Sequence, residues 1–157
     1  MNNKTIVADG IKTVSDDFVT NSLNSIRGSV KVYSKIYRDA LAGLRKMHVQ
    51  LTPEFEAALV RLEDIRVSVF VSTVAKAGVY LNCKTSDDLE TVITIASVSK
   101  LSSILTAAYD NSDAGLIADK AGMFEPTLIK AINHPGEISM SMLIKICQAS
   151  NIELSVK

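Results

Sequence analysis

Residues 15–47 read SDDFVTNSLNSIRGSVKVYSKIYRDALAGLRKM and carry the most regular apolar pattern of the chain. Apolar side chains recur there at alternating steps of four and three residues, at Val19, Leu23, Ile26, Val30, Tyr33, Tyr37, Ala40, Leu44 and Met47. A pattern with this period predicts one long helix with a coiled-coil-like seam. Ser15 is a suitable N-cap for that helix, and Asp16 and Asp17 place negative charge at its positive end.

The seam has two possible uses, which are packing inside the chain and dimerisation. A helix of about 30 residues extends beyond a small domain, and this favours dimerisation. The residues assigned to the oligomer contact are Leu23, Ile26, Val30, Tyr33, Tyr37, Ala40 and Leu44. Basic side chains lie off the seam, at Arg27, Lys31, Lys35, Arg38, Arg45 and Lys46. We interpret them as a solvated face paired with acidic residues of the next helix, with phosphate contact as the alternative.

A second helix is expected after Thr52-Pro53-Glu54, which combine an N-cap, a proline at the first helical position and an acidic first turn. The short link before it predicts that this helix folds back on the first as an antiparallel hairpin. Residues 65–83 remain open between helix and strand, because residues 67–72 alternate with period two and are rich in β-branched side chains. A third helix is expected from Ser86-Asp87-Asp88 through Leu89 to Ala108.

Residues 113–132 read DAGLIADKAGMFEPTLIKAI and have the spacing of a helix-turn-helix. Such a motif needs a glycine with positive φ in its turn and a small residue where the two helices cross. Gly122 and Ala118 meet these needs, and Leu128 is one of the apolar residues expected to hold the helices together. A further helix is expected after Ser139, and the alternating residues 152–156 predict a short terminal strand.

This segment, from residue 112 to 156, resembles the lambda-repressor-like (Cro/C1-type) helix-turn-helix. More narrowly, it resembles the antidote proteins of HigA-type addiction modules. The matching residues are Ile117-Ala118, Ala121-Gly122, Leu128, Lys130-Ala131, Pro135-Gly136, Leu143-Ile144-Lys145-Ile146 and Leu154-Ser155-Val156. The resemblance covers under a third of the chain. It implies DNA binding through a recognition helix at residues 125–132, in most members of the family as a dimer.

Within this module, contact roles follow from where the polar side chains stand. Glu125, Thr127 and Lys130 are assigned to base edges or the groove, and Lys120 to a phosphate. Asn133 and His134 are assigned to the DNA backbone.

The composition of the chain excludes several classes of protein. The 157 residues contain 17 Lys and Arg against 17 Asp and Glu, which excludes a strongly basic histone-like binder. No uncharged stretch approaches the length of about 20 residues that a membrane-spanning helix needs. Two isolated cysteines and the absence of an N-terminal apolar segment indicate a cytoplasmic protein. No nucleophile–base constellation, zinc spacing or glycine-rich phosphate loop occurs, so neither an enzyme nor a metal or cofactor is expected.

The sequence therefore predicts a mostly α protein, in which a long-helix hairpin precedes a helix-turn-helix domain with a short terminal strand. The expected division is a flexible arm over residues 1–14, a helical oligomerisation region over 15–85 and a DNA-binding domain over 86–157. The expected function is that of a dimeric, sequence-specific transcription regulator of bacterial or phage type that binds double-stranded DNA. The alternative is a helical interaction or antitoxin-like factor, possessing a degenerate helix-turn-helix that does not bind DNA.

Overall fold

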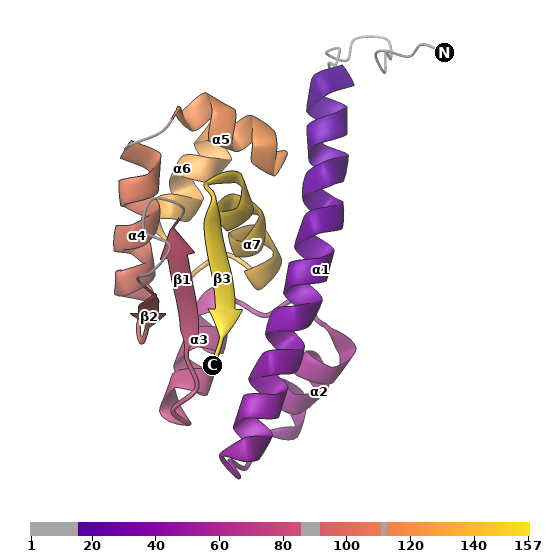
Figure 1. The fold of residues 1–157 in the computed structure, drawn as a ribbon, viewed down its shortest axis with the longest axis vertical. Coiled ribbons are helices and arrows are strands. Elements are labelled where there is room, and N and C mark those ends of the chain that lie inside the picture. The colour runs from indigo at the N-terminus through magenta and orange to yellow at the C-terminus, as the bar shows by residue number, and fades with distance from the viewer. Residues whose placement is uncertain (1–15, 86–91, 111–112) are drawn as a thin grey trace.

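The computed structural model describes residues 16–85, 92–110 and 113–157, without the side chains of 16–29, 85 and 114. The described part is mostly helical and contains a small antiparallel sheet (Figure 1). Its elements are α1 (Asp16–Lys46), α2 (Pro53–Arg61), α3 (Val67–Lys76), β1 (Leu81–Thr85), β2 (Ile93–Ile95), α4 (Val98–Asp110), α5 (Ala114–Ala121), α6 (Glu125–Asn133), α7 (Met140–Ala149) and β3 (Ile152–Val156).

The long first helix is present as predicted, but the second half of its seam belongs to the core. Tyr37, Ala40 and Leu44 have no exposed surface. The Tyr37 ring stacks between Tyr33 and Phe70, with centroid distances of 4.3 and 5.8 Å. Assigning Tyr37, Ala40 and Leu44 to an oligomer contact was therefore wrong, because their side chains are already covered by other parts of the same chain.

The first half of the seam has a different environment. Val30 keeps 59% of its surface exposed. Tyr33 is half-buried, and its hydroxyl donates a hydrogen bond of 3.1 Å to the carbonyl oxygen of Leu62. Leu23 and Ile26 lie on α1, but their side chains are not among those that the structure describes. Ser15 and the predicted arm over residues 1–14 lie outside the described residues. Among the seam residues of this half whose side chains are described, Val30 is the exposed one, and Tyr33 packs partly buried against the core.

The second helix begins as predicted, since the Thr52 hydroxyl accepts a hydrogen bond from the Phe55 N–H at its start. It packs beside α1. Residues 65–83, for which helix and strand were both open, contain one of each, with α3 first and β1 after it. Val67, Phe70, Val71 and Val74 are all buried, and this helical spacing of core residues outweighs the strand preference of β-branched side chains.

The prediction of a third helix from Leu89 to Ala108 is partly wrong, because residues 93–95 form β2 and α4 begins only at Val98. Ile93, Thr94 and Ile95 pair with Cys83, Asn82 and Leu81. The Thr94 hydroxyl also donates a hydrogen bond of 3.1 Å to the side-chain oxygen of Asn82. Pairing with the preceding strand, β1, thus decides the conformation of a β-branched triplet. The expected cap at residues 86–88 lies outside the described part.

The sheet joins the two regions into which the chain was expected to divide. Its order is β2-β1-β3, so β1, from the N-terminal region, is the middle strand between two C-terminal ones. The predicted terminal strand is β3, which pairs with β1 along its whole length. Helix α1 also packs against α5 and α7 (Figure 1). The expected boundary between residues 85 and 86 therefore falls inside one shared structure.

Candidate nucleic-acid interface

Helices α5 and α6 form the predicted pair around a glycine turn. The Asp113 carboxylate caps α5 by accepting from the N–H groups of Gly115 and Leu116, at 2.9 and 3.2 Å. The helix ends at Gly122, whose φ of 70° and ψ of 36° lie in the left-handed region. Glycine adopts this conformation without strain, whereas residues with a Cβ atom are strained in it. Gly122 therefore determines where α5 ends.

The two helices are held together by small and apolar side chains. Ala118 is 4% exposed and Leu128 is fully buried, as expected for the residues at the crossing. Ile117, Ala121 and Ala131 are buried in the same way. The structural residues predicted for the motif, Ala118, Gly122 and Leu128, thus have the burial and backbone conformation that the motif requires.

The next helix, α7, is positioned by a contact that the sequence did not indicate. Ser139 caps it locally, since its hydroxyl accepts from the Met142 N–H. The carboxylate of Asp64, 77 residues earlier, accepts from both the N–H and the hydroxyl of Ser141. The Ile65 carbonyl also accepts from the Met140 N–H at 2.8 Å. Because α7 packs against α5, the segment after α2 helps to orient the helix pair.

All of the residues assigned to DNA contact are exposed. Glu125, Thr127, Lys130 and Asn133 lie on α6, and His134 follows at its end. Thr127, Lys130 and Asn133 recur every three residues, which places them along one side of the helix. Lys120 is exposed on the last turn of α5, on the other helix of the pair.

Two large apolar residues, one just before α6 and one on it, are exposed, which the sequence did not predict. Phe124, which immediately precedes α6, is 74% exposed, and Ile129 on α6 is 38% exposed. Phe124 occupies the N-cap position but makes no capping hydrogen bond through its side chain. The surface of α6 is therefore mixed in character, with one cation, one anion, polar groups and two large apolar side chains.

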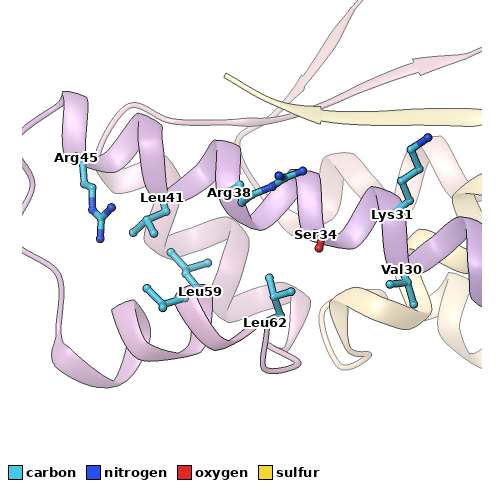
Figure 2. Close-up of a pocket in the computed structure, with 9 residues that line it drawn as sticks. Val30, Lys31, Ser34, Arg38, Leu41, Arg45, Leu59 and Leu62 are labelled. Carbon is cyan, nitrogen blue, oxygen red and sulfur yellow. The ribbon is translucent and has the colours of Figure 1, made fainter.

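A second candidate surface lies between α1 and α2, where nine residues line an open groove (Figure 2). Lys31, Arg38 and Arg45 stand along its α1 side at steps of seven residues. Exposed apolar side chains accompany them, at Val30, Val60 and Leu62. The ion pairs found in the described part are Lys35–Asp39 at 2.6 Å and Arg61–Glu63 at 3.9 Å. The expected pairing of the basic stripe with acids of the next helix is therefore not seen for the three groove cations.

The two cysteines, Cys83 and Cys147, are buried and form no disulfide. Burial raises the pKa of the Cys83 thiol to about 12 and that of Cys147 well above its ordinary value, so both are unreactive core side chains. Among the residues that the structure describes, no three His, Cys, Asp or Glu side chains are grouped so that they could hold a metal. Within the same ranges, no helix has the length and apolar character needed to cross a membrane.

Comparisons of the chain with protein-family models, with curated proteins and with solved structures give no match. Any functional conclusion must therefore come from the geometry and chemistry of the chain itself.

Proposed function

We propose that this protein is a sequence-specific regulator that binds double-stranded DNA through α6. The observation that carries the proposal is the pair α5 and α6, with the left-handed turn at Gly122, the buried crossing at Ala118 and an exposed outer surface on α6. A helix presented in this way fits the major groove of B-form DNA, which is wide enough to admit an α-helix.

The side chains of α6 suit base reading better than charge attraction. The Lys130 ammonium can donate to guanine acceptors, the Thr127 hydroxyl can contact either base type, and the Glu125 carboxylate can accept from cytosine N4. Lys120, Asn133 and His134 would bind the backbone. With Lys120 as the phosphate-binding cation of each protomer, a dimer should show a salt slope of only about −2, and a phosphate contact by Lys130 as well would bring it to about −4.

The proposed regulator is a dimer, formed through the first half of α1. The support for this is Val30, which is 59% exposed although it lies on the apolar seam. Val30→Asp should convert the dimer to a monomer without unfolding it, because a charge would then be buried at the contact. Val69→Asp is the matched control, since Val69 is 45% exposed on α3. Sedimentation of wild type as a monomer at tens of micromolar would contradict the dimer.

Fluorescence anisotropy with a pool of randomised duplexes tests the DNA proposal directly. Lys130→Ala should weaken binding and, if the ammonium meets a phosphate, flatten the salt slope of the dimer by about two units, one for each protomer. Thr127→Ala should instead relax base preference at one or two positions. Lys76→Ala, an exposed lysine at the end of α3, should bind like wild type. Failure of the wild type to bind any duplex at low salt would refute the proposal.

The groove between α1 and α2 favours a second candidate function, in which the protein binds a partner protein. Lys31, Arg38 and Arg45 have no ion pair among the described residues and flank exposed apolar side chains. We propose an amphipathic partner segment that carries acidic side chains. A labelled helical peptide of Glu and Leu should bind the wild type and lose affinity when the three cations are replaced by Glu. Lys76→Glu should leave that affinity unchanged, and equal binding by all variants would rule the groove out.

A further inference from the structure

Phe124 and Ile129 are large apolar side chains that are exposed at the start of α6 and along it. Phe124 is 74% exposed at the start of the helix and Ile129 is 38% exposed in its middle. The polar residues Thr127 and Lys130 are exposed on the same helix. Leaving large apolar side chains in water forfeits the stabilisation that their burial would bring.

Helix stability does not account for Phe124. The position before the first residue of a helix favours Ser, Thr, Asp or Asn, whose side chains accept from the first N–H groups. Asp113 and Ser139 do this for the helices on either side of α6, but Phe124 makes no such bond. The Phe124 side chain therefore does not cap the helix, and most of its surface is in contact with solvent.

We infer that Phe124 and Ile129 contact the 5-methyl groups of thymines in the major groove. This inference rests on the proposed DNA-binding function and adds a specificity to it. The thymine methyl is the apolar feature that base edges present in that groove, so it is the feature that exposed phenyl and sec-butyl side chains can recognise. The preferred site therefore contains thymines facing the start and the middle of α6.

The charge of the helix pair makes such contacts important. From residue 113 to 133, the exposed cations Lys120 and Lys130 are outnumbered by the carboxylates of Asp113, Asp119 and Glu125. Attraction to phosphate supplies most nonspecific affinity for DNA. A surface with little net attraction must obtain discrimination from the bases, and apolar burial against a methyl group supplies it without charge.

Replacing thymine by uracil tests the inference, because uracil lacks the 5-methyl group but keeps the O4 acceptor and the pairing of thymine. The probe is a randomised duplex pool from which the full-length protein selects its preferred sequences, resynthesised with either thymine or uracil. Wild type should bind the uracil form about fourfold more weakly for each methyl group that it buries. Phe124→Ser and Ile129→Ala should each bind the two forms with a smaller difference. Phe124→Ser also supplies a capping hydroxyl, so it is expected to fold.

Leu116→Ala is the matched control, because Leu116 is 51% exposed on α5 and should keep the full difference between the two forms. Equal binding of the thymine and uracil forms by wild type would overturn the inference while leaving DNA binding intact. A difference that survives in both α6 variants would show that other residues read the methyl group. Failure to bind either form would instead refute the proposed function itself.

Discussion

Removing one oxygen from Tyr37 tests whether the second half of the α1 seam is core or contact surface. The Tyr37 hydroxyl accepts a hydrogen bond of 3.0 Å from the Ile65 N–H, in a buried position. Tyr37→Phe keeps the ring between Tyr33 and Phe70 but leaves that N–H without its partner. Ile65 is only 7% exposed, so water has little access to replace the lost acceptor.

A buried donor left unsatisfied costs about 1–3 kcal/mol. In a chain of this length, each kcal/mol lowers the melting temperature by about 2–4 °C. Urea unfolding followed by circular dichroism should therefore show a lower midpoint for Tyr37→Phe with an unchanged slope. The effect should not depend on protein concentration, because the lost bond lies inside one chain.

Tyr33→Phe supplies the control, since it removes a hydroxyl that donates to the Leu62 carbonyl in an exposed bond. Water can replace that bond, so the cost should stay below about 1 kcal/mol. Equal destabilisation by the two substitutions would refute the argument from burial. A Tyr37→Phe protein that is as stable as wild type but dissociates more readily would mean that the seam faces a second molecule.

Three further predictions concern local features. Gly122→Val should lower the free energy of unfolding by about 1–3 kcal/mol in urea, because valine is strained at a positive φ. Asp113→Ala should lose about 1 kcal/mol by leaving the start of α5 uncapped, whereas Asp113→Asn should retain most of the stability in the same measurement. The free energy of unfolding should fall as pH rises above about 9, because the unfolded chain then loses thiol protons that folded Cys83 keeps up to a pKa of about 12. Titrating the stability of Cys83→Ala should give a shallower decline.

The elements that the sequence predicted correctly are those with local signals. Thr52 and Pro53 mark the start of α2, and Gly122 marks the end of α5 through its own backbone preference. The alternation of residues 152–156 indicates a strand, and β3 is present there. In each case the physical cause lies within a few residues of the effect, so no knowledge of the rest of the chain is needed.

The features that the sequence missed depend on partners outside their own segment. Ile93 to Ile95 become a strand because β1 is available to pair with them. The bond between Asp64 and Ser141 spans 77 residues and has no local signature. The α1 seam was recognised as apolar, but periodicity alone does not say whether the surface that covers it belongs to the same chain or to another.

That divided seam has a mechanical consequence for the proposed regulator. Tyr37 to Leu44 fix the second half of α1 in the core, and α1 also packs against α5 and α7. From Val30 to Tyr37 the helix advances only about 10 Å. A dimer contact that begins at Val30 is therefore joined to the helix-turn-helix by one continuous helix rather than by a linker. In a dimer built this way, the separation of the two α6 helices is set by the packing of α1, and half-site spacing in the DNA becomes as specific as the bases themselves.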